Sequence, residues 1–268
     1  MQRLKGKSIL FTGAFGLIGK EICTHYMNEG ARVAWTDIII DEKMVSWLRE
    51  NFAETDFIVV EMDITNEQQV AEGVEKIIAH FGTIDVLVNN AAIDAKFDKA
   101  GISKVNQTCL ENYPIDLLRK SVEVNLTGTI IMTQAACRQM LKQGYGNIIN
   151  VASTYSVVAP NQGLYDFGQE TQNYKPIDYI ASKSFIPNFT RYIATFYAKD
   201  NIRCNAVVPH GILNNHDEAF LANFAKLSPL QRMANREEMR GPFTLLASDE
   251  SSYMTGSVLM VDGGWTAW

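Results

Sequence analysis

The sequence predicts an α/β fold: a doubly wound parallel sheet of about seven strands, formed by a single domain. Short runs rich in Val, Ile and Leu alternate with longer segments of helical period from one end of the chain to the other. The short runs are apolar at successive positions, which is typical of strands that helices cover on both faces. No linker, repeat or low-complexity stretch interrupts this alternation within the 268 residues, so we expect residues 1–268 to form one domain.

The first half of the chain begins with a strand at residues 7–11, which runs into a glycine-rich turn. A helix then runs to about Asn28 and is ended by Gly30. Further along, Thr65-Asn66 can cap a helix that extends to His80. The elements expected here are strands at 7–11, 32–36, 57–61 and 85–88, and helices up to 28, at 43–52 and up to 80.

The second half continues the alternation with longer helices. Residues 115–140 are helical in period, and residues 179–199 are too, despite Pro187. The remaining expected elements are strands at 147–151, 202–208 and 258–261, and a helix at 237–247.

Two polar and aromatic segments do not fit this rhythm. They are residues 94–113 and 159–178, and each follows a predicted strand. Open parallel sheets bind ligands beyond the carboxyl ends of their strands. We therefore expect these two segments, together with residues 210–236, to be the walls of a substrate pocket.

Composition excludes several classes of protein. With 47% hydrophobic and 20% charged residues, the chain is globular rather than disordered. No apolar run reaches the length of about 18 residues that spans a membrane, and the N-terminal apolar run is too short for a signal peptide, which predicts a cytoplasmic protein without a membrane partner. The net charge of −6 argues against nucleic acid as the partner, and the cysteines and histidines lack metal-ligand spacing.

The glycine-rich turn joins the first strand to the first helix. Gly13, Gly16 and Gly19 let backbone approach a pyrophosphate closely, and Leu17 and Ile18 begin a helix whose N–H groups favour anions. An ordinary tight turn is the alternative. The strand–turn–helix context favours a Rossmann-type dinucleotide-binding site.

A carboxylate ends the second predicted strand, 24 residues after Gly13. Asp37 is placed to accept hydrogen bonds from an adenosine ribose and to repel a 2′-phosphate, and no cation follows it before Lys43. This favours NAD over NADP, although Asp37 could instead cap a helix. Asp63, followed by Ile64 after the third strand, could contact adenine or cap the next helix, and the sequence leaves both open.

Tyr179 and Lys183 are four residues apart, so they share one face of a helix. A cation about 4 Å from the phenol is worth up to about 4 kcal/mol at an effective dielectric constant of about 20. That corresponds to at most about three units of pKa and would bring the phenol near neutrality, where general acid–base catalysis works best. We therefore expect Tyr179 to transfer protons, while a chance pairing on a helix surface is the alternative.

These motifs together resemble the short-chain dehydrogenase/reductase family over nearly the whole chain. The residues that carry the resemblance are Thr12–Gly19, Asp63, Asn89-Asn90-Ala91-Ala92, Asn125, Ser153, Tyr179, Lys183, Pro209 and Val261-Asp262-Gly263-Gly264.

The resemblance implies a role for each matching residue. Tyr179 would be the general acid–base, Lys183 would lower its pKa and bind the nicotinamide ribose, and Ser153 would bind the reacting oxygen. Asn125 would hold a water of the proton relay. The remaining cofactor contacts would be Asn90, Ala91 and Ala92 near the adenosine ribose, and Pro209, Gly211 and Ile212 near the nicotinamide. Family members are commonly tetramers, so a homo-tetramer or homo-dimer is expected.

The chain departs from the family pattern in four places. The glycines are spaced G-x-x-G-x-x-G, as in the longer, epimerase-like branch. The N-N-A-G of the family reads Asn89-Asn90-Ala91-Ala92, and Pro209 is followed by His210 before Gly211. Ser153 and Tyr179 are 26 residues apart, against about a dozen in the family. The extra stretch is rich in amides and aromatic rings, which suit a polyhydroxylated ligand. A loop that packs on a neighbouring subunit is the alternative.

A narrower resemblance concerns four segments: residues 90–98, 153–155, 229–235 and 251–268. They look like oxidoreductases of bacterial surface-glycan gene sets, and the flagellin-modification (legionaminic-acid-type) proteins are the nearest. The predicted function is therefore NAD(P)-dependent oxidation or reduction of a secondary alcohol or ketone of a sugar, with NAD favoured. The alternatives are a reductase of 3-ketoacyl thioesters or other small ketones, and a cofactor-binding scaffold without catalysis.

Overall fold

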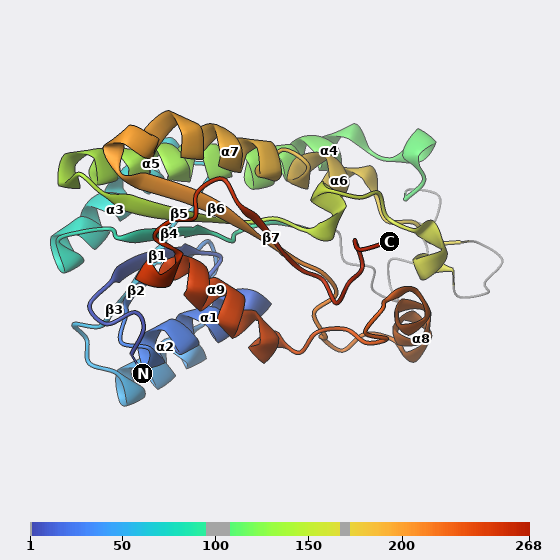
Figure 1. The fold of residues 1–268 in the computed structure, drawn as a ribbon, viewed down its shortest axis with the longest axis horizontal. Coiled ribbons are helices and arrows are strands. Elements are labelled where there is room, and N and C mark those ends of the chain that lie inside the picture. The colour runs from blue at the N-terminus through green and yellow to red at the C-terminus, as the bar shows by residue number, and fades with distance from the viewer. Residues whose placement is uncertain (1, 95–107, 167–171) are drawn as a thin grey trace.

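The computed structural model describes residues 2–94, 108–166 and 172–268, and it has a single parallel sheet at its centre (Figure 1). The sheet has seven strands in the order β3-β2-β1-β4-β5-β6-β7, which confirms the predicted fold class. The strands are β1 (Ser8–Thr12), β2 (Arg32–Asp37), β3 (Phe57–Glu61), β4 (Val86–Asn89), β5 (Gly146–Val151), β6 (Ile202–Pro209) and β7 (Val258–Val261).

The strand order reverses beside β1, and this reversal places the binding crevice. The chain builds outward from β1 through β2 to β3, then returns to lay β4 along the other side of β1. Leu10 of β1 is in register with Ala34 on one side and Leu87 on the other. Connections leave β1 and β4 in opposite directions, so a crevice opens beyond their carboxyl ends.

Helices cover both faces of the sheet (Figure 1). Alternate residues of β1 point to opposite faces: Ile9 and Phe11 pack with residues of α1, α2 and α9, and Leu10 packs with residues of α3, α5 and α7. The helices are α1 (Leu17–Asn28), α2 (Glu42–Asn51), α3 (Glu67–Phe81), α4 (Ile115–Val122), α5 (Thr129–Gln143), α6 (Ile177–Lys183), α7 (Ile186–Tyr197), α8 (Glu218–Leu227) and α9 (Arg240–Ala247).

Three predicted helices are divided or shortened. Residues 115–140 form α4 and α5 with a π-helical turn at Glu123–Gly128 between them, and such turns are frequent at functional sites. Residues 179–199 form α6 and α7, because Pro187 lies in the first turn of α7, where its missing N–H is not needed. The expected helix at 237–247 begins as a 3₁₀ turn at Arg236–Met239 and becomes α9 only from Arg240.

Helix α8 was not predicted: the sequence indicated only a pocket wall over residues 210–236. Asp217 caps it by accepting a hydrogen bond from the amide of Ala219. Phe224 of α8 is buried in an apolar cluster with Leu164, Tyr165, Met233 and Trp265. This cluster lies outside the two cores that flank the sheet and ties part of the predicted 159–178 wall to α8 and the C-terminal segment.

Among the described residues, no helix is both long enough and apolar enough to cross a membrane.

Candidate active site

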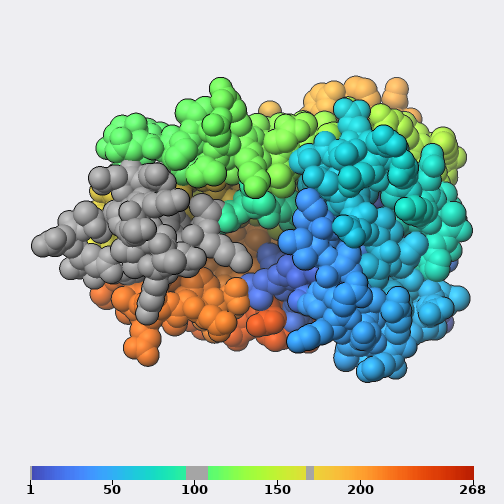
Figure 2. Space-filling view, turned by 180° about the vertical axis from the view of Figure 1, so that it is seen from behind, coloured from blue at the N-terminus to red at the C-terminus, as the bar shows by residue number. Residues whose placement is uncertain are grey.

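A cavity of about 1730 Å³ lies beyond the carboxyl ends of the strands. On the face seen in Figure 2, the surface is hollowed where the blue N-terminal half meets the orange segment near α8. Of the predicted site residues, those that line this cavity are Gly13, Gly16, Leu17, Ile18, Asp37, Asp63, Ile64, Asn90, Ala91, Ala92, Ser153, Tyr179, Lys183, Pro209, Gly211 and Ile212. Gly19 and Asn125 do not line it.

The glycine turn brings bare backbone to the cavity wall. Gly13 has a φ of +67°, and a Cβ there would lie 2.8 Å from the Cα of Ala91. Gly16 precedes α1 and provides no side-chain cap, so the first amides of the helix remain available to an anion. A Cβ at Gly19 would overlap the carbonyl oxygen of Gly13, which shows that this glycine serves the packing of the turn rather than the cavity surface. The turn fits a dinucleotide pyrophosphate.

Asp37 lines the cavity at the end of β2. Its carboxylate accepts hydrogen bonds from the amides of Phe15 (3.0 Å) and Ile38 (2.8 Å), which fixes it beside the glycine turn. The helix-cap alternative for Asp37 is wrong, because Asp41 caps α2 by accepting from the amides of Lys43 and Met44.

Asp63 also lines the cavity, two residues after the end of β3. One carboxylate oxygen accepts hydrogen bonds from both the amide and the hydroxyl of Thr65 (2.9 and 2.7 Å). Asn66, not Asp63, caps α3. The helix-cap alternative is therefore wrong for Asp63 as well, and its contact with adenine stays a prediction.

Hydrogen bonds hold the end of β4 against the glycine turn. The hydroxyl of Thr12 accepts from the amides of Asn90 (3.0 Å) and Ala91 (3.1 Å). The Asn90 side chain in turn donates to the carbonyl oxygens of Thr12 and Gly13, both at 3.1 Å. This network fixes the two sides of the crevice relative to each other.

Asn125 lies in the π-helical turn and is completely buried. Its amide oxygen accepts from the backbone N–H of Ile93 (2.8 Å), and its amide nitrogen donates to the Ile93 carbonyl (2.9 Å) and the Ser182 hydroxyl (2.8 Å). The side chain therefore joins the loop after β4 to α6. The water predicted for it stays a prediction, and the observed contacts give it a positioning role.

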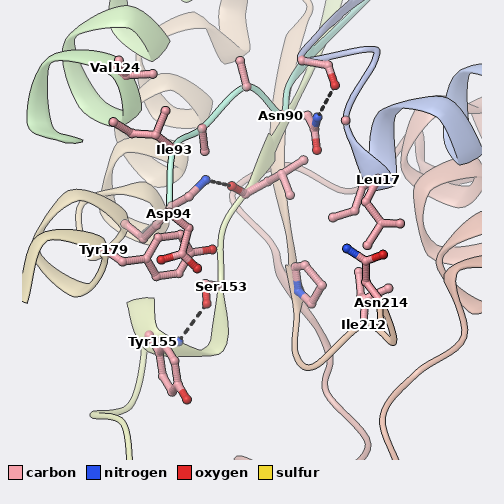
Figure 3. A pocket seen from close by; sticks show the side chains of 18 of the residues that line it. Leu17, Asn90, Ile93, Asp94, Val124, Ser153, Tyr155, Tyr179, Ile212 and Asn214 are labelled. Carbon is pink, nitrogen blue, oxygen red and sulfur yellow. Dashed lines mark hydrogen bonds between the residues drawn. The ribbon is translucent and has the colours of Figure 1, made fainter. Parts of the chain in front are cut away.

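Ser153 and Tyr179 point into the same part of the cavity (Figure 3). Burial raises the pKa of Tyr179 well above its usual value, the Asp94 carboxylate raises it further, and a hydrogen bond with Ser153 opposes both. The prediction that Lys183 would lower this pKa is wrong for this structure. The Lys183 ammonium instead donates to the carbonyl oxygen of Val151 (2.8 Å), and burial lowers its own pKa to about 8.

The sequence matches a family model described as enoyl-(acyl carrier protein) reductase over residues 13–266. It is also 32% identical to an L-rhamnose 1-dehydrogenase (NAD(P)(+)) of Sphingomonas, covering 98% of each chain. The chain belongs to the short-chain dehydrogenase/reductase family. It is an oxidoreductase of this family, and the family's nicotinamide dinucleotide fits the crevice described above.

Further members of the family show how broad the similarity is. A 3-oxoacyl-[acyl-carrier-protein] reductase of Thermotoga maritima is 35% identical, covering 98% of each chain. The post-translational flagellin modification protein A of Campylobacter coli is 28% identical, covering 98% of this chain and 99% of its own. A short-chain dehydrogenase of Leptospira borgpetersenii, solved with bound NAD⁺, superimposes with a TM-score of 0.83 at 29% identity, covering 98% of this chain and 94% of its own.

His210 stands where the family pattern has a glycine, and it is buried. Its Nδ1 pairs with the hydroxyl of Thr154, and its ring packs on Trp265 and Phe224 at centroid distances of 4.2 and 5.1 Å. Burial lowers its pKa to about 4, so the ring is neutral at physiological pH. Sequence analysis identified the substitution without predicting this packing.

The predicted pocket walls lie partly outside the described residues. From their described parts, the cavity is lined by Asp94, by Leu164, Tyr165, Asn173 and Lys175, and by residues from His210 to Met233. Tyr155 also lines it, and its hydroxyl lies 3.0 Å from that of Tyr165. Sequence analysis missed Tyr155 as a site residue. Its position two residues after Ser153 could have indicated it.

Proposed function

We propose that the protein transfers a hydride between NAD and a secondary alcohol or ketone of a sugar or sugar derivative. One observation carries the proposal: Ser153, Tyr179 and Lys183 line the same cavity as the uncapped start of α1. Proton-transfer groups and a dinucleotide cradle therefore open onto one space.

The chain's own residues handle the proton. In the oxidising direction the carbinol C–H and O–H bonds break, the C=O bond forms, and the products are a ketone, the reduced dinucleotide and a proton. The Tyr179 oxygen accepts the hydroxyl proton, and the Ser153 hydroxyl orients the reacting oxygen. Lys183, which lines the same cavity, would hold the nicotinamide ribose. When bound, the nicotinamide supplies the hydride acceptor, and the reverse reaction uses each group in the opposite sense.

The adenosine end of the cavity supports NAD over NADP. The Asp37 carboxylate opposes a 2′-phosphate, and the residues that follow it, Ile38 and Ile39, are exposed and uncharged. Lys20 also lines the cavity, but its ammonium is paired with Asp41 at 2.5 Å. A 2′-phosphate would have to compete with this carboxylate for the lysine.

The substrate end supports a carbohydrate. Aromatic rings and amide side chains line it, a pairing that suits C–H faces and hydroxyl edges. The named similarity to a rhamnose dehydrogenase and to a flagellin modification protein supports a role in bacterial surface-glycan biosynthesis in the cytoplasm. Assembly as a homo-tetramer or homo-dimer is part of the same proposal.

Two alternative functions are each favoured by a specific observation. Reduction of a 3-ketoacyl thioester is favoured by the Thermotoga relative, and the description of the family model also names an acyl-carrier-protein substrate, although for reduction of an enoyl group. The lysines that would serve a thioester carrier, Lys96, Lys99 and Lys104, lie outside the described residues. A non-catalytic scaffold is favoured only by the replacement of glycine by His210 and by the altered glycines.

The test is NAD-dependent absorbance change with a panel of hexoses, amino sugars, hexose phosphates and nucleotide sugars, with acetoacetyl-CoA as the thioester. Wild-type protein should turn over one sugar class with NAD, and Tyr179→Phe should lose at least about 10²-fold in rate while binding NADH normally. Preferred turnover of acetoacetyl-CoA would replace the sugar proposal. Retained turnover in Tyr179→Phe would contradict the mechanism, and NADH binding without any turnover would favour the scaffold.

A further inference from the structure

An ion pair joins two walls of the cavity next to Tyr179. The ammonium of Lys175, which precedes α6, lies 2.6 Å from each carboxylate oxygen of Asp94, which follows β4. Both residues line the cavity. The Lys175 side chain is 7% exposed and that of Asp94 is 44% exposed, so the pair is sealed on the lysine side and open on the carboxylate side.

Three further contacts hold Lys175 in place. The amide of Lys175 donates to the side-chain oxygen of Gln162 (2.9 Å), which anchors the backbone. The Lys175 nitrogen lies 4.4 Å from the centre of the Tyr179 ring and 6.0 Å from that of Tyr155. A cation held over these rings gains additional attraction. The pair is therefore positioned beside the group that exchanges the substrate proton.

Stability alone does not explain this pair. Burial of an ammonium group is unfavourable in free energy. An ion pair with a carboxylate that is itself half exposed offsets only a small part of this desolvation free energy. An ammonium has three donors, whereas among the described residues Asp94 is its only hydrogen-bond acceptor, with two oxygens. The carboxylate retains lone pairs that Lys175 does not use. Both groups can therefore bind a ligand without separating.

The charges decide which ligand fits. Because the pair is neutral as a whole, it offers no net attraction to a carboxylate or phosphate. A hydroxyl group suits it, since its hydrogen can go to Asp94 and its oxygen can accept from Lys175. The pair lies beside the Tyr179 ring, so the hydroxyl that it reaches is near the reacting oxygen but distinct from it.

We propose that Asp94 and Lys175 form a recognition site for a hydroxyl group on the carbon next to the reacting carbon. The substrate class is then a neutral vicinal diol or the corresponding hydroxyketone, as polyhydroxylated carbohydrates provide. This inference rests on the proposed function. Asp94 and Lys175 determine specificity in it, while Tyr179 remains the group that transfers the proton.

The experiment compares butane-2,3-diol with butan-2-ol, which lacks only the neighbouring hydroxyl, as substrates with NAD. The wild-type protein should favour the diol in kcat/KM by about 10- to 100-fold. Lys175→Met and Asp94→Asn should each lose most of this preference, because the diol reaction slows by more than the butan-2-ol reaction. Removing either charge also changes the surroundings of Tyr179, but that effect acts on both alcohols and cancels in the preference ratio. Lys175→Arg should retain part of it. The matched control is Lys76→Met, an exposed lysine of α3, which should keep the full preference.

The preference ratio separates recognition from a structural role. If the ion pair only joined the two walls, its loss would slow both alcohols equally and lower the melting temperature, which would overturn the inference. A wild-type protein that oxidises a panel sugar but shows no preference for the diol would also overturn it and leave the proposed function intact. Absence of turnover with both alcohols and the whole panel would instead refute the proposed function, on which the inference depends.

Discussion

Replacement of Lys183 by methionine should change how the stability of the protein depends on pH. Lys183 is 3% exposed, and burial lowers its pKa to about 8 from an ordinary value of 10.5. Between these two values the unfolded chain keeps a proton on this lysine that the folded chain has released. Because the unfolded state binds more protons in this window, the free energy of unfolding of the wild-type protein should rise with pH there.

The pKa values set the size of the effect. Their difference is worth about 3 kcal/mol in total, at about 1.4 kcal/mol per pKa unit. From pH 7 to pH 9.5 the wild-type protein should gain about 2 kcal/mol relative to Lys183→Met. The variant also loses the hydrogen bond to the Val151 carbonyl. That loss shifts its stability by nearly the same amount at each pH, so it does not alter the comparison of slopes.

Urea denaturation at several pH values from 7 to 9.5, followed by tryptophan fluorescence, measures both proteins. Lys76→Met provides the matched control, because that lysine is exposed and its variant should run parallel to the wild type. Parallel curves for Lys183→Met and the wild type would refute the reasoning. They would mean that burial does not depress the pKa of Lys183.

Two further substitutions test the cradle and the third apolar cluster. Gly13→Ala forces a φ of +67° on a residue with a Cβ and brings that atom within 2.8 Å of the Ala91 Cα. It should weaken NADH binding at least about tenfold in a fluorescence titration, and unchanged affinity would remove Gly13 from the cradle. Phe224→Ala empties the cluster around Trp265 and should cost about 3–5 kcal/mol in urea denaturation, whereas a cost below about 1 kcal/mol would show that the cluster collapses to fill the space.

The sheet could be predicted because its strands are buried on both faces. Strand β1 is an example: Ile9, Leu10 and Phe11 are apolar at successive positions and all buried, so the position of the strand follows from the sequence alone. Helix α8 is different, since Phe224 packs against Leu164, Tyr165 and Trp265 instead of the sheet. The cap at Asp217 and the spacing of Phe220 and Phe224 were the signals available for it.

The candidate site also has residues that a local sequence pattern predicts and residues that it does not. Tyr179 and Lys183 are neighbours on one helix, so their spacing alone predicts that they lie together. Asp94 and Lys175 are 81 residues apart, and no local pattern links them. The error about the pKa of Tyr179 has a related cause: burial sets its direction, and the extent of burial depends on tertiary packing that a local motif does not contain.

The unfavourable free energy of burying charged and polar groups in the site is concentrated where the substrate would bind. The cofactor end is built from glycines and backbone amides, which bind a pyrophosphate without burying a charge. The substrate end buries the ammonium groups of Lys175 and Lys183 and the imidazole of His210. The Nε2 of His210 has no hydrogen-bond partner among the described residues, so its desolvation is not offset by a hydrogen bond. Since natural proteins retain such costs mainly at functional sites, the residues that give this chain its own specificity should be sought at the substrate end.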